Sequence, residues 1–167
     1  MNYHQIQYDD MVNGEGLRVT LFVSGCERKC PDCQNPQTWP FYSGIPFDQN
    51  AEKEILEAVS MPYIDGLTIS GGEPLHPNNI HETVRIAKEV KRTYPNKTVW
   101  VYTGYLFDQI PVWALTHIDV LVDGMFIKEL ISPNRPWVGS SNQRVIDVQK
   151  SLLENRVVLF QGESVNE

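Results

Sequence analysis

Apolar positions along this chain repeat at two intervals, and the shorter interval predicts strands. Apolar side chains occupy every second position from residue 19 within residues 18–24, and a second short apolar run covers residues 67–69. Residues 98–103 and 119–122 are rich in β-branched and aromatic side chains, which is typical of buried strands. The pattern predicts two further elements at the edges of the sheet, residues 144–148 and 156–160.

Between these strands the apolar residues recur at the longer interval, every three to four residues, which predicts helices. Asn50 is expected to cap the first of them. Asn79 and Glu82 have the spacing of a capping box at the start of a second helix, in which apolar residues recur at helical intervals. Residues 105–116 form a weaker helical pattern, because Pro111 interrupts it.

This order of elements predicts an α/β fold. Strands that alternate with helices imply a parallel sheet with right-handed crossovers. About four β/α units are too few to close an eight-fold barrel, so we expect an incomplete, open (β/α) barrel with a mostly parallel sheet. At 167 residues the chain is expected to form a single domain, residues 1–167, in which the tail after about residue 148 is unassigned.

Loops that leave the carboxyl ends of parallel strands gather at one rim, where ligands bind. The sequence predicts four such loops, at residues 26–33, 70–74, 103–105 and 123–124. Asp123 either faces this rim or caps its own strand, and residues 140–144 bind either a cofactor or a partner protein.

Composition and charge exclude several classes of function. The chain carries 14 Lys and Arg against 21 Asp and Glu, a formal net charge of −7, and its basic residues form no extended cluster. Such a chain lacks the footprint of a nucleic-acid binder and is repelled by anionic lipid surfaces. No apolar run approaches the roughly 20 residues that cross a bilayer, and no secretory signal is recognisable. We therefore predict a cytoplasmic protein without nucleic-acid or membrane partners.

The cysteines are the most informative residues. All three, Cys26, Cys30 and Cys33, lie within eight residues in a CxxxCxxC pattern. An odd and tightly spaced set is poor material for structural disulfides. A [4Fe–4S] cluster usually takes four cysteine ligands, so three would leave one iron without a protein ligand. The spacing also allows a zinc site completed by His or Asp, or plain free thiols.

A second motif, residues 70–74 with the sequence SGGEP, follows the run at 67–69. Glycines let the backbone approach a ligand closely, and Gly72 is expected to adopt φ values that only glycine tolerates. Glu73 offers an acceptor for a cationic group. Taken alone, the motif is more typical of a turn that ends a strand.

The cysteine motif followed by GGEP resembles the radical S-adenosylmethionine superfamily, and within it the activating proteins of anaerobic ribonucleotide reductases. Gln34 stands where that family often has an aromatic residue or His, and Asp32 precedes the last cysteine. The resemblance covers nearly all of the chain and includes blocks at residues 12–16, 21–33, 38–39, 71–74, 101–105, 122–124 and 139–143.

The resemblance implies a role for each motif. It implies that the metal ligands are Cys26, Cys30 and Cys33, which bind three irons of a [4Fe–4S] cluster, while the open iron binds the amino and carboxylate groups of S-adenosylmethionine. The residues implied to hold the methionine end are Gly71, Gly72 and Glu73. Those implied to border the adenine are Asp32, Cys33 and Gln34.

The resemblance also implies the reaction. One electron, from a donor such as a flavodoxin, cleaves S-adenosylmethionine and yields a 5′-deoxyadenosyl radical. That radical takes a hydrogen from one glycine in the large subunit of the reductase. Two alternatives stay open: another short radical S-adenosylmethionine enzyme, of the formate-lyase-activase or deazaguanine-pathway type, or a non-catalytic metal-binding or electron-transfer module.

Overall fold

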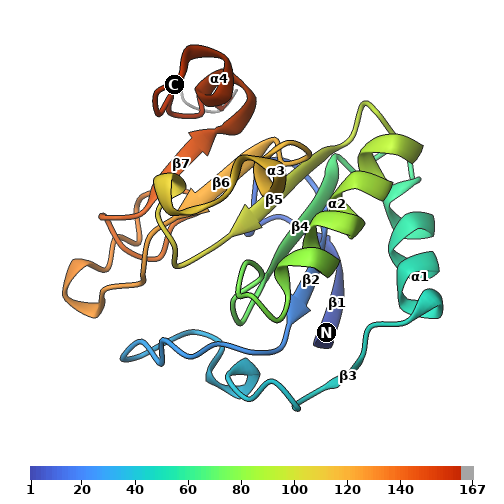
Figure 1. Ribbon diagram of the computed structural model, residues 1–167, viewed down its shortest axis with the longest axis horizontal. Coiled ribbons are helices and arrows are strands. Elements are labelled where there is room, and N and C mark those ends of the chain that lie inside the picture. The colour runs from blue at the N-terminus through green and yellow to red at the C-terminus, as the bar shows by residue number, and fades with distance from the viewer. Residues whose placement is uncertain (163–167) are drawn as a thin grey trace.

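One seven-stranded sheet organises residues 1–162, the part of the chain that the computed structural model describes (Figure 1). The strand order is β3-β1-β2-β4-β5-β6-β7. Four neighbouring strands in the middle are parallel: β2 (Arg18–Val23), β4 (Gly66–Gly71), β5 (Thr98–Tyr102) and β6 (Val120–Asp123). The outer strands are antiparallel to their neighbours: β1 (Asn2–Asp10), β3 (Ile45–Pro46) and β7 (Arg144–Asp147).

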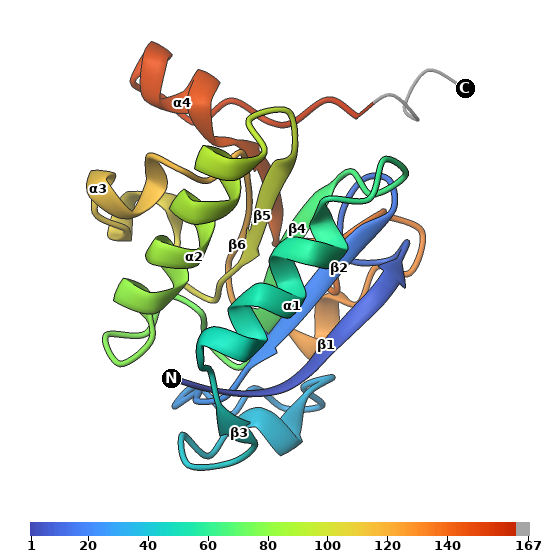
Figure 2. The ribbon, with the colours of Figure 1, turned by 90° about the vertical axis from the view of Figure 1, so that its right-hand side faces the viewer.

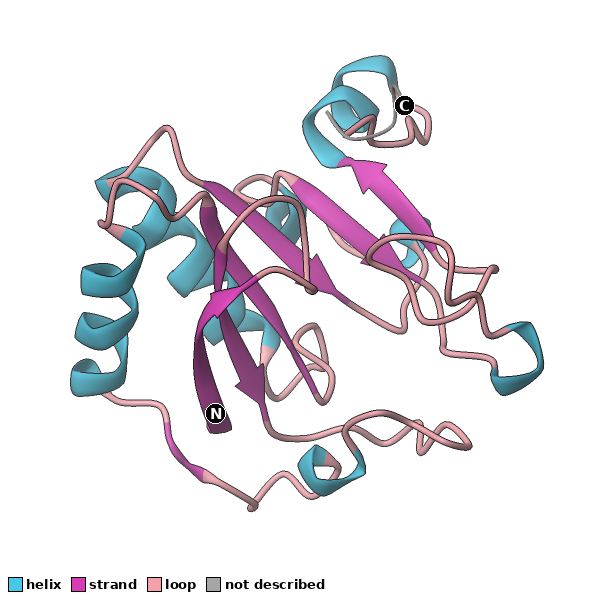
Figure 3. Cartoon of the chain, turned by 180° about the vertical axis from the view of Figure 1, so that it is seen from behind, coloured by secondary structure: helices cyan, strands magenta, loops and turns pink. Residues whose placement is uncertain are grey.

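The sheet is open, with β3 and β7 as its two edges (Figure 3). The predicted α/β class is confirmed, and the prediction of a mostly parallel sheet holds for the four middle strands. The antiparallel outer strands make the sheet mixed, and it does not close into a barrel.

The strand β1 was not predicted, because its sequence lacks a regular alternation. Two register shifts, between Tyr3 and Gln5 and between Gln7 and Asp10, interrupt its ladder with β2. Each such irregularity changes which face the following side chains point to, so the two-residue period is lost. Within β1 only Tyr3 and Asp10 are buried.

The helix α1 (Gln49–Val59) begins two residues earlier than its predicted cap implied. Asp48 is the N-cap, and its carboxylate accepts a hydrogen bond from the Ala51 N–H at 2.9 Å. The prediction of Asn50 as the cap is therefore wrong. Both residue types suit a cap, and the extended backbone of Asp48 decides between them.

Two other helix predictions are also wrong in part. The helix α2 (Ile80–Thr93) follows Asn79, but the Asn79 side chain makes no capping hydrogen bond, so the predicted capping box does not form. Residues 105–116 do not form one continuous helix. They contain a 3-10 turn (Phe107–Gln109) and, after Pro111, the short helix α3 (Val112–Leu115).

The two faces of the sheet differ in chemistry. Helices α1 and α2 cover one face (Figure 2), where they pack on aliphatic strand residues that are fully buried, such as Leu21, Ile69 and Val101. Burying each of these side chains contributes about 1.5–3 kcal/mol. Alternate residues of the same strands point to the other face and are polar or aromatic. They include Thr20, Thr68, Ser70, Trp100 and Tyr102, which share one face by the strand register.

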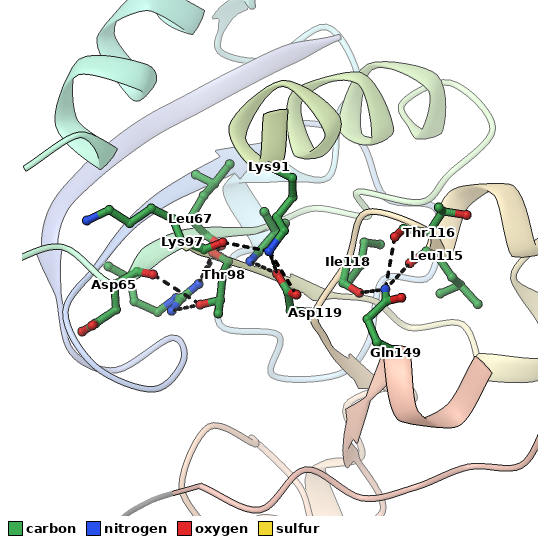
Figure 4. A network of polar contacts seen from close by, with 12 residues as sticks. Asp65, Leu67, Lys91, Lys97, Thr98, Leu115, Thr116, Ile118, Asp119 and Gln149 are labelled. Carbon is green, nitrogen blue, oxygen red and sulfur yellow. Dashed lines mark hydrogen bonds and ion pairs between the residues drawn. The ribbon is translucent and has the colours of Figure 1, made fainter. Parts of the chain in front are cut away.

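Polar side chains fix the amino ends of the central strands (Figure 4). Lys91 of α2 donates to the Lys97 carbonyl oxygen at 3.0 Å and forms an ion pair with Asp119 at 3.1 Å. Asp119 also accepts from the Val99 N–H at 2.8 Å. Gln149 donates from its amide to the Ile118 carbonyl oxygen at 2.8 Å. Strands β5 and β6 are therefore anchored at the end opposite to the predicted rim.

The chain after β7 forms the helix α4 (Val148–Glu154). Residues 156–160, predicted as an edge element, form no strand of their own and contribute a single bridge between Ile146 and Leu159. The end of the predicted tail, residues 163–167, lies outside the described residues. Within residues 1–162 there is no helix with the length and apolar character needed to cross a bilayer.

Candidate cofactor site

A cavity of about 510 Å³ lies where the central parallel strands end. Residues from all four predicted rim loops line it, among them Cys26, Gly72, Thr103 and Gly124. The predicted convergence of these loops is thus confirmed. The sequence did not predict two further wall segments: the β1–β2 connection at Met11, Val12 and Asn13, and the β6–β7 connection around Trp137.

The cysteine loop has an irregular backbone that sets the direction of its side chains. Lys29 and Asp32 both have positive φ, 48° and 57°, a conformation that non-glycine residues rarely adopt. Cys26, Cys30 and Cys33 are free thiols, and all three line the cavity. Burial raises the pKa of the Cys26 and Cys30 thiols. The two left-handed turns therefore let one short loop present three sulfur atoms to one space.

The glycine turn packs directly against the start of the cysteine loop. The Gly72 N–H donates to the Val23 carbonyl oxygen at 2.8 Å, and the Glu73 N–H donates to the Gly25 carbonyl oxygen at 2.7 Å. A Cβ atom on Gly72 would lie 2.7 Å from that same Gly25 oxygen. Gly72 is required for this close approach, and the expectation that it has a special φ is wrong. The positive φ, 101°, belongs to Gly71.

The Glu73 carboxylate is buried and already bonded within the protein. One oxygen, Oε1, accepts from the Leu75 N–H at 3.0 Å and the Thr103 hydroxyl at 2.7 Å. The other, Oε2, accepts from the Gly104 N–H at 2.7 Å and lies 3.6 Å from Arg28 Nε. Burial raises the pKa of Glu73 against the opposing effect of these hydrogen bonds. This carboxylate holds the glycine turn, the β5 loop and the cysteine loop together.

Asn79 is a site residue that the sequence interpretation missed. Its buried amide donates to the Ser24 carbonyl oxygen at 2.9 Å and to the Glu73 carbonyl oxygen at 3.0 Å. The same side chain therefore holds the end of β2 beside the glycine turn. Its position three residues before Glu82 suggested only a helix cap.

The two residues expected beside the adenine lie in different surroundings. Gln34 lines the cavity together with Cys33. Asp32 does not line it, and instead forms an ion pair with Lys128 at 2.9 Å, in which both side chains are more than half exposed. Lys128 begins the 3-10 turn Lys128–Leu130 in the β6–β7 connection. This ion pair therefore joins the cysteine loop to the β6–β7 connection, and other residues of both segments line the cavity.

The comparisons with known proteins agree with this geometry. Residues 12–146 match the family described as 4Fe-4S single cluster domain. The chain is 45% identical over 148 residues to the anaerobic ribonucleoside-triphosphate reductase-activating protein of Haemophilus influenzae, covering 86% of this chain and 96% of that protein. The proteins of the same name from Escherichia coli K12 and from phage T4 are each 43% identical, covering 87% of this chain and 97% and 93% of theirs. The chain belongs to the family of anaerobic ribonucleoside-triphosphate reductase-activating proteins.

The residues that line the cavity fit an iron–sulfur cluster. Three thiols from one loop face one cavity, and two buried donors on its wall, Arg28 Nε and Trp39 Nε1, have no hydrogen-bond partner within residues 1–162. Unpaired buried donors are rare and indicate where a polar ligand fits. No three His, Cys, Asp or Glu side chains of residues 1–162 are placed to hold a single metal ion. In a four-iron cluster each thiolate ligates a separate iron.

Two further predictions, Asp123 and the segment 140–144, concern residues that support the loops around the cavity. Asp123 is fully buried and accepts from the Phe107 N–H at 2.8 Å and from Arg144 at 2.6 Å, so of the two predicted roles the structural one fits its contacts. In the predicted segment 140–144, Gln143 accepts from the Gly139 N–H at 2.8 Å and donates to the Gly124 carbonyl oxygen at 3.0 Å. These polar side chains shape the wall of the cavity.

Proposed function

We propose that this protein activates an anaerobic ribonucleoside-triphosphate reductase by reductive cleavage of S-adenosylmethionine. The cluster, when bound, supplies the electron that breaks the sulfonium C–S bond, and the resulting 5′-deoxyadenosyl radical takes the α-hydrogen of one glycine in the large subunit. The observation that carries this proposal is one cavity lined by Cys26, Cys30 and Cys33 and by the glycine turn. The names of the relatives support the same reductase as the partner.

The residues of the chain hold the cluster and S-adenosylmethionine in place and keep water away from them. In this proposal the three cysteine sulfurs would hold the cluster in the cavity that they line. Gly71 and Gly72 bring backbone close to the methionine end of S-adenosylmethionine, since Gly72 lies against Gly25 at the start of the cysteine loop and Gly71 against Val23 at the end of β2. Because the Glu73 carboxylate already has hydrogen bonds to other loops, its contribution is to fix this turn rather than to offer a free carboxylate oxygen.

The adenine end is proposed to lie beside Cys33 and Gln34, which line the cavity. Asp32 would reach the adenine only by leaving its ion pair with Lys128.

The open sheet is proposed to be an incomplete barrel of the radical S-adenosylmethionine type, whose open side admits a glycine loop of the reductase. A glycine lacks a Cβ atom that would block its α-hydrogen. The electron is proposed to come from a one-electron donor such as a flavodoxin, in the cytoplasm.

The deciding experiment follows the transfer of deuterium from the reductase to 5′-deoxyadenosine. The protein, reconstituted anaerobically with iron and sulfide and then reduced, is mixed with S-adenosylmethionine and a reductase deuterated at its glycine α-carbons. We expect deuterium in 5′-deoxyadenosine and a glycyl radical signal on the reductase. If S-adenosylmethionine is cleaved but the label never transfers, the protein is another short radical S-adenosylmethionine enzyme. If the cluster forms without any cleavage, the protein is an electron-transfer module.

A further inference from the structure

Arg28 lies between the first two cysteines of the motif, and no role is assigned to it by the proposed function. Its guanidinium carbon sits 4.3 Å from the centre of the Tyr105 ring, and its Nε lies 3.6 Å from Glu73 Oε2. The side chain is about three-quarters buried, at 24% exposure, and lines the same cavity as the three cysteines. A cation is therefore built into the cavity wall.

The surrounding residues are shaped to hold this cation in place. A Cβ atom on Gly104 would lie 2.4 Å from Arg28 Nε, so glycine at this position leaves room for the side chain. The Gly104 N–H in turn donates to Glu73, whose carboxylate faces Arg28. The Tyr105 ring contacts the guanidinium in a cation–π geometry. Three separate contacts thus restrict where the positive charge lies.

A fixed charge acts strongly in this position. Two charges interact more strongly where burial lowers the local dielectric than they do in water. Arg28 lines the same cavity as Cys26, Cys30 and Cys33, so its guanidinium lies beside the space that the three sulfurs face. Its positive charge therefore favours added negative charge on a group held in that space.

We propose that the positive charge of Arg28 raises the reduction potential of the cluster. This inference rests on the proposed function. A [4Fe–4S]²⁺ core with three thiolates carries one net negative charge, and it carries two after reduction. The one-electron donor loses one electron and the cluster gains it, with no proton transferred and no bond formed or broken in this step. The nearby guanidinium stabilises the more negative, reduced state more than the oxidised one.

The test compares midpoint potentials of the reconstituted proteins, followed by the paramagnetic signal of the reduced cluster without S-adenosylmethionine. We expect R28Q to have a more negative potential than the wild type, and R28K, which keeps the charge, to lie closer to the wild type. Lys29→Gln is the matched control, because it removes the same charge from the neighbouring, exposed residue. Equal potentials for R28Q and the wild type would overturn the proposal, as would a shift of the same size in K29Q.

A second pair of variants covers the case in which R28Q leaves the Glu73 carboxylate buried without its cation and fails to take up a cluster. Comparing R28Q/E73Q with E73Q removes the arginine where no carboxylate is left uncompensated. We expect the double variant to have the more negative potential, and equal potentials contradict the role of Arg28. Cleavage of S-adenosylmethionine by the wild type reports separately on the proposed function. A wild type that takes up no cluster overturns both.

Discussion

The amide of Asn79 donates to the carbonyl oxygen of Glu73 at 3.0 Å, and through this bond the first residue before α2 holds the glycine turn. The same amide nitrogen donates to Ser24 at the end of β2, at 2.9 Å. The Asn79 side chain is thus a buried cross-link between the end of β2 and the glycine turn, which lines the cavity. Asn79 is not among the residues predicted to bind the cluster or S-adenosylmethionine.

Replacing Asn79 with Leu should destabilise the protein by about 1–3 kcal/mol, because the Ser24 carbonyl oxygen loses its bond from the buried amide and the Glu73 carbonyl oxygen keeps only the His76 N–H, at 3.2 Å. The affinity for S-adenosylmethionine should fall as well, since the glycine turn loses its tie to β2. Urea unfolding and calorimetry of the two variants measure these effects. Asn78→Leu is the control, as Asn78 is exposed and adjacent. Similar losses in both variants would show that the cross-link is unimportant.

The parallel middle of the fold could be predicted from the sequence because its strands keep an unbroken pattern. The aliphatic residues of β2, β4 and β5 face the helices in every case. β1 could not be predicted, because its register shifts break the alternation. The choice between Asp48 and Asn50 as a cap depends on backbone conformation, and propensity does not distinguish these residue types.

For the site, local motifs were predictable and long-range partners were not. The cysteine spacing and the GGEP motif each lie within one short segment, so the sequence displays them directly. The roles of Arg28 and Asn79 depend on residues 45 and 55 positions away in the chain, at Glu73 and Ser24. A side chain's function as a cross-link becomes visible only when the sheet brings these segments together.

Replacing any one of Cys26, Cys30 or Cys33 with Ala should abolish both cluster assembly and cleavage of S-adenosylmethionine. The chain has three cysteines in all, so no spare thiol can substitute. Absorbance near 400 nm after anaerobic reconstitution, and 5′-deoxyadenosine production, provide the two measurements. A single variant that kept the full absorbance and full cleavage would remove that cysteine from the site.

Replacing Gly72 with Val should separate the glycine turn from the cysteine loop. The added Cβ atom would begin 2.7 Å from the Gly25 carbonyl oxygen, which is backbone and cannot rotate away. Overpacking of this kind typically costs about 1–3 kcal/mol. Thermal unfolding should show the loss of stability, and calorimetry should show weaker binding of S-adenosylmethionine. Unchanged binding would mean that the turn has only a structural role.

Asp10 connects the end of β1 to the loop that borders the cavity. Its carboxylate accepts from the Thr20 hydroxyl at 2.6 Å, from the Asn13 amide at 2.7 Å and from the Val12 N–H at 2.8 Å. Burial acts to raise the pKa of Asp10, but these hydrogen bonds together outweigh it, so the pKa lies below its usual value. The ionised carboxylate therefore stabilises the fold.

The lowered pKa of Asp10 fixes how this stabilisation depends on pH. A carboxyl group whose pKa is lower in the folded state stabilises it fully above the unfolded value, about 3.9 for Asp, and the contribution is lost as pH falls through the folded pKa. Replacing Asp10 with Asn should therefore lower the free energy of unfolding by about 1–3 kcal/mol at pH 7, where the charged acceptor is lost. The difference from the wild type should shrink below pH 4. Urea unfolding at a series of pH values measures it, and Asp9→Asn, at the exposed neighbouring residue, should show little difference at any pH. A difference between D10N and the wild type that stayed constant down to pH 3 would mean that the Asp10 charge does not stabilise the loop beside the cavity.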